Sequence, residues 1–373
     1  MKLEGRYPMF LRSTHSNGEP NMLVTSRLLV LCITGLTAII SVGGCATATN
    51  SSTPPALVSE DVMVPSPDAG ISLFMRNKAP IGMKAFSAEK TVLFVHGATY
   101  PSETTFDLKL GEQSWMDYIA SRGFDVWLVD VRGYGRSVKT AALSQPASAN
   151  PPFANTEEAV RDVTTAVDYI LKRRGITKLN LIGWSWGTTI MALYTTRNNE
   201  RVNKLVLYAP VWTPPTVGKP PAAPTAAYRT VTVDAARQRW YNGVPAEKQA
   251  ALIPAGWFDI WARALLESDP DGAKLSPPVV RAPNGTMVDI LGSWLLGKRL
   301  YEAEQIRVPT MLIKAEWDAD TPAYMAQGLF ASLKNAPYKS YIEVGEGTHT
   351  LMLEKNRMQL FRPVQALLED PAP

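Results

Sequence analysis

Short apolar runs alternate with helical segments along most of this chain, and that alternation limits the folds open to it. Five runs rich in Val, Ile and Leu end at a glycine or a polar turn. They are 91–96, 125–131, 179–183, 204–209 and 310–315. None shows the strict polar alternation of a half-exposed strand, so we expect strands buried on both faces. Weaker strand patterns lie at 71–76 and 339–344.

Helical patterns occupy the stretches between these runs. The clearest is 156–174, where Val160, Val163 and Val167 share one face, acidic residues open the segment, basic residues close it and Gly175 follows. A shorter helix is expected at 112–121. Strands and helices that alternate in this way predict an α/β fold with a mostly parallel central sheet flanked by helices.

The alternation stops between about 212 and 305. This stretch begins rich in proline (TPPTVGKPPAAPT) and then carries four tryptophans in short helical pieces: Trp240, Trp257, Trp261 and Trp294. It is too long for a loop between buried strands. We therefore predict a helical cap, 212–305, inserted over the carboxyl ends of the strands in a core formed by 61–211 and 306–373. The tryptophans either line an apolar pocket or form the core of the cap.

The N-terminus carries a targeting segment. Residues 28–42 form an apolar run after a basic residue, shorter than the roughly 20 residues of a membrane span. The run ends in VGGC at 42–45, which resembles a bacterial lipobox and implies cleavage before Cys45, lipidation of its thiol and attachment to a membrane of the cell envelope. The alternatives are an uncleaved anchor or an unmodified signal that yields a secreted or periplasmic protein. We predict a signal peptide over 1–45 and a flexible tether over 46–60.

Cysteine content and charge exclude several functions for the body of the chain. The two cysteines, Cys32 and Cys45, lie in the targeting segment, so the body holds no disulfide, cysteine nucleophile or thiolate metal site. The formal net charge is +4, and residues 1–45 hold four basic and two acidic residues, which leaves the rest near neutral. Because there is no basic run or stripe, we expect no nucleic-acid partner.

One glycine-bounded turn has the residues of a nucleophile site. Gly183-Trp184-Ser185-Trp186-Gly187 follows a predicted strand and opens an apolar helix. A sharp turn there holds the serine hydroxyl out at the edge of the sheet, with an N–H of the helix N-terminus facing the same space. We predict Ser185 as the nucleophile of a hydrolase. The two tryptophans beside it pack under the turn or, alternatively, contact substrate.

A serine hydroxyl needs a base, and the chain offers few. Of its three histidines, His15 lies in the targeting segment and His96 belongs to a separate motif after a strand. His349 remains, in a loop between the last strand pattern and an apolar helix. We predict His349 as the general base.

The base must be oriented by an acid. Asp318 and Asp320 both follow the strand pattern 310–315 directly. Either could instead cap the helix that starts near Pro322. Residue type and position alone leave both as candidates.

These residues stand in the order Ser185, Asp318, His349, which resembles the α/β-hydrolase fold superfamily of serine esterases and lipases. The resemblance covers the body from about residue 60 to the C-terminus. Asp318 lies four residues before a proline, a spacing that resembles the acid turn of this family and favours Asp318 over Asp320.

Two further motifs carry the same resemblance. His96-Gly97-Ala98 resembles the HG motif of the family, and DVRGYGRS at 130–137 resembles its D-x-R-G-x-G-x-S turn. The resemblance implies that the N–H groups of Ala98 and Trp186 form an oxyanion hole and that His96 is a structural residue of its turn.

The activity that the resemblance implies is cleavage of carboxylic esters through an acyl-enzyme intermediate, as in a carboxylesterase or lipase. The substrate would be a small or lipid-like ester, and neither a metal nor an organic cofactor is needed. An acyltransferase, an amidase or a carbon–carbon bond hydrolase could use the same triad. The non-enzyme alternative is a catalytically inactive, lipid-anchored binding protein.

Overall fold

Eight strands form the central sheet of the computed structural model, which describes residues 55–371. The strands are β1 (Leu57–Pro65), β2 (Ser72–Pro80), β3 (Thr91–Val95), β4 (Asp125–Val129), β5 (Leu179–Trp184), β6 (Val202–Tyr208), β9 (Thr310–Ala315) and β10 (Lys339–Val344). Their order is β1-β2-β4-β3-β5-β6-β9-β10. The pairs β1–β2 and β2–β4 are antiparallel and the remaining pairs are parallel. The α/β class with a mostly parallel sheet is thereby confirmed.

The described residues do not include the expected signal peptide or Cys45. They do include part of the expected tether 46–60, and here the prediction was wrong in part, because β1 begins at Leu57. β1 lies at the sheet edge and exposes most of its side chains. A mostly exposed edge strand carries no buried apolar run, which is why the sequence pattern did not show it.

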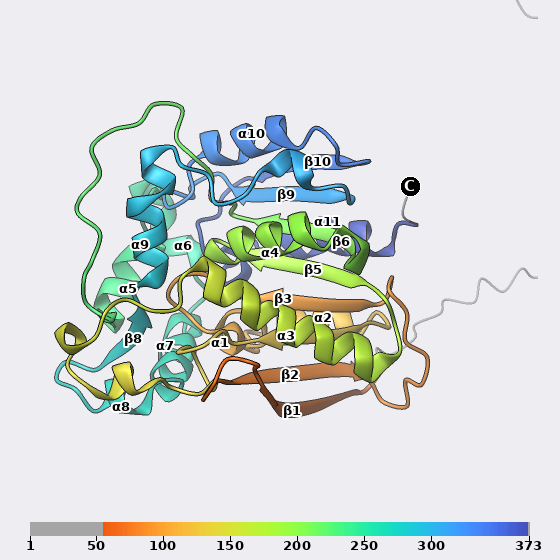
Figure 1. Ribbon diagram of the computed structural model, residues 1–373, viewed down its shortest axis with the longest axis horizontal. Coiled ribbons are helices and arrows are strands. Elements are labelled where there is room, and N and C mark those ends of the chain that lie inside the picture. The colour runs from red at the N-terminus through yellow and green to blue at the C-terminus, as the bar shows by residue number, and fades with distance from the viewer. Residues whose placement is uncertain (1–54, 372–373) are drawn as a thin grey trace, which may run out of the picture. The chain divides into compact units, whose positions relative to one another are not determined.

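Helices cover both faces of the sheet (Figure 1). One face carries α3 (Thr156–Arg174), α4 (Trp186–Arg197) and α10 (Ala323–Ser332), whose apolar side chains share a buried cluster. The other face carries α1 (Ser102–Phe106), α2 (Trp115–Ala120) and α11 (Met358–Glu369), which share a second cluster. The expected helix 156–174 is confirmed at both ends. Asn155 and Glu158 form a capping box at its start, and Gly175 ends it with a φ of 66°.

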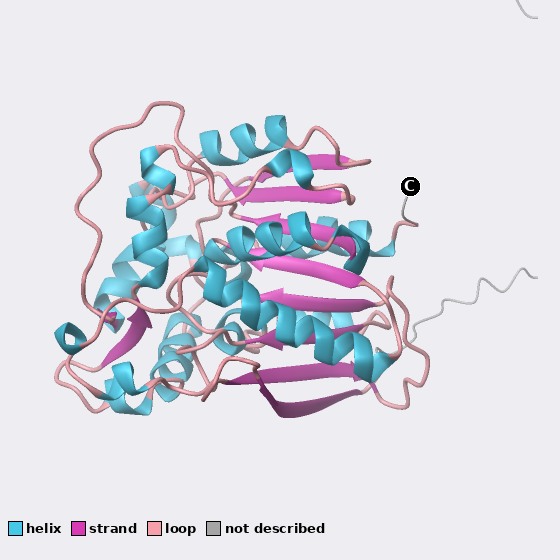
Figure 2. Ribbon diagram, in the orientation of Figure 1, coloured by secondary structure: helices cyan, strands magenta, loops and turns pink. Residues whose placement is uncertain are grey.

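The connection from β6 to β9 holds the remaining elements. They are β7 (Tyr228–Thr232), α5 (Val233–Trp240), α6 (Gln249–Leu252), α7 (Trp257–Glu267), α8 (Pro270–Ala273), β8 (Val279–Pro283) and α9 (Gly285–Gly292). Figure 2 shows these elements gathered at the end of the sheet where the parallel strands end, as the predicted cap requires. The cap is not purely helical, because β7 and β8 form an antiparallel two-stranded sheet within it.

Short 3-10 turns lie at Ala141–Ser144, Ala147–Ala149, Asn199–Arg201, Ala246–Lys248, Trp294–Leu296, Ala303–Gln305 and Leu351–Leu353. The proline-rich stretch 213–225 contains neither helix nor strand. Within the described part of the chain, no helix is both long and apolar enough to cross a membrane.

Candidate active site

Ser185 occupies a strained turn between β5 and α4. Its backbone angles are φ 55° and ψ −122°. A positive φ is unfavourable for a residue that carries a side chain and costs about 1–3 kcal/mol. Its N–H donates to the carbonyl of Tyr208 on neighbouring β6 at 2.9 Å, which holds the turn against the sheet. Strand, turn and helix therefore present the hydroxyl at the carboxyl end of β5.

The glycines of the motif permit close packing around this turn. A Cβ on Gly183 would lie 2.3 Å from the carbonyl oxygen of Gly187, and a Cβ on Gly187 would lie 2.5 Å from that of Val95. Neither glycine is at positive φ. The strained backbone thus belongs to Ser185, and the glycines let α4 approach β3 and β5.

Asp318 and His349 form a hydrogen-bonded pair. Asp318 follows β9 and His349 follows β10, and these strands are parallel neighbours, so their carboxyl ends lie side by side. Nδ1 of His349 lies 3.0 Å and 2.9 Å from the two carboxylate oxygens of Asp318. With Nδ1–H donating, Nε2 is left as the free acceptor that a general base requires.

The surroundings of Asp318 keep its carboxylate charged. Burial raises its pKa, but the charge and hydrogen bond of His349 and the hydrogen bonds of Thr321 outweigh that effect, and the pKa lies below its ordinary value. Thr321 donates its N–H at 2.9 Å and its hydroxyl at 2.7 Å. The acid is therefore ionised at neutral pH and fixed in orientation.

Asp320, the other acid candidate, has a different partner. Nε of Arg239 in the cap donates to its carboxylate at 2.7 Å. The alternative role of an aspartate as cap of α10 is wrong, because the residue at that position is Pro322 and no side chain caps the helix. The structure thus brings Asp318, not Asp320, to His349.

The side chains of Trp184 and Tyr208 hold the histidine loop, a role that the sequence predicted for neither residue. The indole N–H of Trp184 donates to the carbonyl oxygen of His349 at 2.9 Å, and the hydroxyl of Tyr208 donates to the same oxygen at 3.0 Å. Their positions next to Ser185 and at the end of β6 were the only sequence signal available. Among the described residues no hydrogen bond joins Ser185 Oγ to the imidazole; such bonds often tighten only when substrate is bound.

Trp184 and Trp186 pack under the turn and do not contact the cavity. They are 2% and 1% exposed. The indole N–H of Trp186 donates to the hydroxyl of Thr156 on α3 at 3.0 Å. Of the two interpretations of these tryptophans, packing is therefore confirmed.

The expected oxyanion donors lie on two neighbouring elements. Ala98 follows β3, and Trp186 is the first residue of α4. The backbone N–H of a first helical residue has no partner within its helix. The carbonyl of Ala98 accepts from the hydroxyl of Tyr134 at 2.8 Å and from Arg229 at 2.6 Å. These two bonds fix the loop in which the N–H of Ala98 lies.

His96 is a structural residue of the adjoining turn. It is fully buried, its Nδ1 donates to the carbonyl of Gly97 at 2.7 Å, and its Nε2 accepts from the N–H of Val131 at 3.2 Å. Burial lowers the pKa of His96 to about 4. Both ring nitrogens are therefore occupied, and His96 is neutral and unable to serve as a base.

A cavity of about 340 Å³ opens over Ser185. Its apolar wall is formed by Val211, Met287, Ile290 and Met325, and its polar wall by side chains that include Arg229, Arg239 and Asp320. None of the cap tryptophans lines it. Trp240 and Trp261 instead pack on each other, with ring centroids 4.8 Å apart, in the core of the cap. Their interpretation as pocket lining is therefore wrong.

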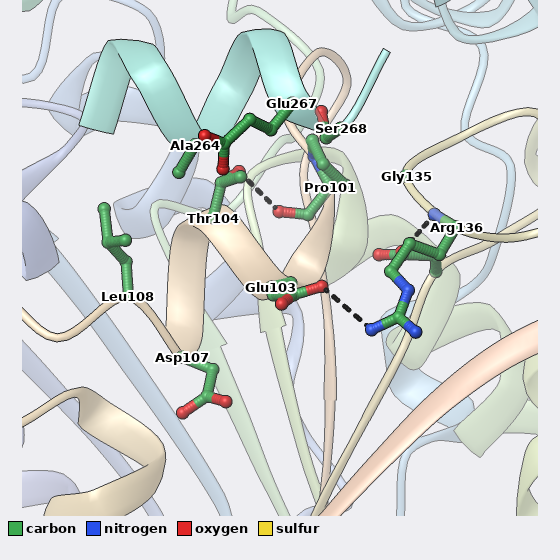
Figure 3. Close-up of a pocket in the computed structure, with 11 residues that line it drawn as sticks. Pro101, Glu103, Thr104, Asp107, Leu108, Gly135, Arg136, Ala264, Glu267 and Ser268 are labelled. Carbon is green, nitrogen blue, oxygen red and sulfur yellow. Dashed lines mark hydrogen bonds and ion pairs between the residues drawn. The ribbon is translucent and has the colours of Figure 1, made fainter. Parts of the chain in front are cut away.

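A second cavity of about 210 Å³ lies between α1 and α7 (Figure 3). Its wall is acidic, but two of the carboxylates, those of Glu103 and Asp107, have basic partners. Glu103 pairs with Arg76 at 2.8 Å and faces Arg136, and Asp107 pairs with Lys78. Neither Ser185 nor the Asp318–His349 pair lines this cavity. Of these two cavities, only the first is lined by Ser185.

Comparisons with known proteins agree with this architecture. The family model described as alpha/beta hydrolase fold matches residues 90–355. The chain belongs to the α/β-hydrolase fold family. A serine hydrolase from the polyaromatic-hydrocarbon-degrading bacterium Cycloclasticus zankles shares 15% sequence identity, with a TM-score of 0.54 over 84% of this chain and 98% of that one. A likeness at this identity shows the fold alone.

Sequence relatives include different hydrolases. A probable lipase of Schizosaccharomyces pombe is 32% identical over 122 residues, which cover 32% of this chain and 28% of the lipase. The proline iminopeptidase of Neisseria meningitidis serogroup B is 27% identical over 237 residues, which cover 57% of this chain and 71% of that protein. The chain spans about a third of the length of the lipases it matches.

Proposed function

We propose that this protein is a serine hydrolase that cleaves carboxylic esters through an acyl-enzyme intermediate. The proposal rests on the hydrogen-bonded Asp318–His349 pair, which lies at the carboxyl ends of the parallel strands, as Ser185 does. Ser185 also lines a cavity. The family membership and the lipases among the relatives support hydrolysis of esters.

In the first half-reaction, Nε2 of His349 takes the proton from Ser185 Oγ as the oxygen attacks the ester carbonyl. The carbonyl oxygen becomes an anion that accepts from the N–H groups of Ala98 and Trp186. One such donor lowers the barrier by about 3 kcal/mol. His349 then gives its proton to the leaving alcohol, and the acyl group remains on Ser185.

In the second half-reaction, water replaces the alcohol. His349 takes a proton from the water as it attacks the acyl-enzyme, and the same N–H pair holds the oxyanion. The proton passes to Ser185 Oγ as the acid leaves. Throughout, the Asp318 carboxylate keeps Nδ1 of His349 protonated and stabilises the imidazolium that forms.

An amidase is the second candidate, because a proline iminopeptidase is among the relatives and covers more of this chain than the lipases do. An ester and an amide differ in the leaving group that His349 must protonate. Matched p-nitrophenyl esters and p-nitroanilides of increasing acyl length separate the two, because an amidase cleaves the p-nitroanilide of its preferred acyl group whereas an esterase leaves it intact. We expect cleavage of the esters and none of the anilides at any chain length.

Active-site labelling tests the proposed chemistry directly. A fluorophosphonate probe should label the wild type and leave Ser185→Ala unlabelled. Ser332→Ala, which removes a hydroxyl on α10 that donates to Gly328, is the matched control and should label fully. Absence of labelling in the wild type, or equal labelling of Ser185→Ala, would instead favour the inactive binding protein.

A further inference from the structure

Two arginines of the cap line the cavity over Ser185. Arg229 lies in β7 and Arg239 lies in α5, and both are partly buried. The nucleophile mechanism uses neither guanidinium group as a reacting group. Charged groups that line a catalytic cavity but take no part in the reaction can instead bind a substrate group of opposite charge.

The charge of Arg229 has only neutral partners. Its terminal nitrogens donate to the carbonyls of Ala98 at 2.6 Å and Pro283 at 2.8 Å and to the hydroxyl of Thr99 at 3.0 Å. No ion pair within residues 55–371 includes Arg229. Burial lowers its pKa, and the charge of Arg239 acts in the same direction. A desolvated cation without an anion is unfavourable.

Arg239 adds a second cation on the same wall. Its Nε is paired with Asp320, while Nη1 donates to the Thr99 hydroxyl at 3.4 Å. Arg229 donates to that same hydroxyl, so the two guanidinium groups converge on one atom. Two cations and one carboxylate therefore line the cavity beside Ser185, and the polar wall carries a net positive charge.

We propose that the substrate of this site carries a carboxylate next to the ester, and that Arg229 and Arg239 bind it. A carboxylate would supply the anion that Arg229 lacks, through short charge-assisted hydrogen bonds. The hydrocarbon segment between the two ends would lie on the apolar wall, against side chains such as Met287 and Ile290. The substrate class is then a half-ester of a dicarboxylic acid or an ester of a hydroxy acid.

A neutral lipid ester fits this cavity less well. It would desolvate the Arg229 guanidinium further and offer it only weak acceptors. A purely structural role for Arg229, as the tie between β7 and the loop of Ala98, would account for its hydrogen bonds. That role does not explain Arg239, and it predicts no preference between charged and neutral substrates.

The inference rests on the proposed ester hydrolysis, so the test uses isosteric ester pairs that separate the two ideas. In the first pair the acyl part differs, as monoethyl glutarate and ethyl 4-nitrobutyrate. In the second the alcohol part differs, as 4-acetoxybutyrate and 3-nitropropyl acetate. Nitro and carboxylate groups have the same shape, and only the carboxylate is charged. Proton release in a pH-stat gives kcat/KM for each ester.

We expect the carboxylate member of at least one pair to have a kcat/KM about tenfold or more above its nitro partner. The pair that shows the preference identifies which side of the ester faces the arginines. Hydrolysis of both members at equal rates would overturn the proposal and leave ester hydrolysis standing. Absence of both hydrolysis and fluorophosphonate labelling would overturn the proposed function instead.

Variants assign the preference to the arginines. Arg239→Gln and Arg229→Gln should each lower the carboxylate-to-nitro ratio by about fivefold or more, with the nitro ester as internal reference. Arg237→Gln is the matched control, because Arg237 lies on the same helix, pairs with Asp259 at 2.9 Å and does not line the cavity. Its ratio should equal that of the wild type. An unchanged ratio in both test variants would contradict the assignment.

A binding measurement makes the test independent of turnover. Ser185→Ala should bind monoethyl glutarate more tightly than ethyl 4-nitrobutyrate by calorimetry, and Arg239→Gln in that background should remove the difference. Equal affinities in Ser185→Ala would contradict the proposed carboxylate subsite whatever reaction the protein performs.

Discussion

Trp184 donates its indole N–H to the backbone carbonyl of His349 at 2.9 Å, and the two rings lie 5.1 Å apart. The residue before the candidate nucleophile thereby holds the loop of the candidate base. These residues are 165 positions apart in the chain. The bond ties the turn after β5 to the loop after β10 across the two intervening strands.

Removal of this bond should affect turnover more than folding. Trp184→Phe keeps an aromatic ring under the turn and loses the donor, and we expect kcat to fall about fivefold, equivalent to about 1 kcal/mol, with KM little changed. Trp127→Phe removes a similar indole bond, to Asp125 at 2.8 Å on β4, and serves as control. If both variants lose kcat equally, the Trp184 bond has no specific role.

The two aspartates after β9 should differ sharply. Asp318→Asn leaves the shape intact but disturbs the histidine tautomer, and we expect kcat to fall by about 10⁴. Asp320→Asn breaks the pair with Arg239 and should lower kcat less than tenfold. Steady-state rates on a p-nitrophenyl ester give the ranking, and the reverse ranking would identify Asp320 as the orienting acid.

Glu354 gives the fold a pH dependence near neutrality. It is fully buried beneath the histidine loop and accepts from the N–H of Thr348 at 3.0 Å and the hydroxyl of Thr350 at 3.0 Å. Burial raises its pKa from 4.5 to about 7. The folded protein favours the protonated carboxyl of Glu354. The stabilisation of the folded state that this group provides is therefore complete below about pH 4.5 and is lost as pH rises through about 7.

Glu354→Gln removes that titration and keeps a donor and an acceptor at the same place. The melting temperature of the variant minus that of the wild type should therefore increase between pH 4.5 and pH 8. Thermal unfolding measured across this interval checks the prediction. A difference that stays constant with pH would show that Glu354 does not titrate there.

Close packing at Gly187 should tolerate no side chain. A Cβ there would lie 2.5 Å from the carbonyl oxygen of Val95 and 2.6 Å from that of His96, and both are backbone atoms that cannot rotate away. We expect Gly187→Ala to lower the free energy of unfolding by about 2–4 kcal/mol or to prevent folding. Gly218→Ala, with nothing within 4 Å of the added Cβ, should stay within about 0.5 kcal/mol of the wild type. Denaturant titration compares them.

Cys45 should be the site of lipid attachment. Its place at the end of VGGC motivates the prediction, although it lies outside the described residues. In a bacterial host, radiolabelled palmitate should enter the wild type and not Cys45→Ser. Failure of the wild type to incorporate the label would leave export without a lipid anchor.

Local sequence patterns are enough to predict the buried elements of the core. Five strands are continuous apolar runs because both of their faces pack against helices. They are β3, β4, β5, β6 and β9. Helix α3 was predicted to the residue because local signals mark its ends: acidic residues in the first turn, basic residues in the last turn and Gly175 after it. The glycine-bounded turn after a predicted strand sufficed to nominate Ser185, and the small number of histidines sufficed to nominate His349.

Features that residues far apart in the chain form together could not be predicted from local patterns. β1 and β7 expose much of their surface, so their apolar pattern is too weak to predict them. The partners of Asp318 and Asp320 depend on which loop reaches each carboxylate in space. Arg229 of the cap donates to the carbonyl of Ala98 in the core, 131 positions away in the chain. Sequence periodicity indicates which side chains are buried, but it does not indicate which residues far apart in the chain contact each other.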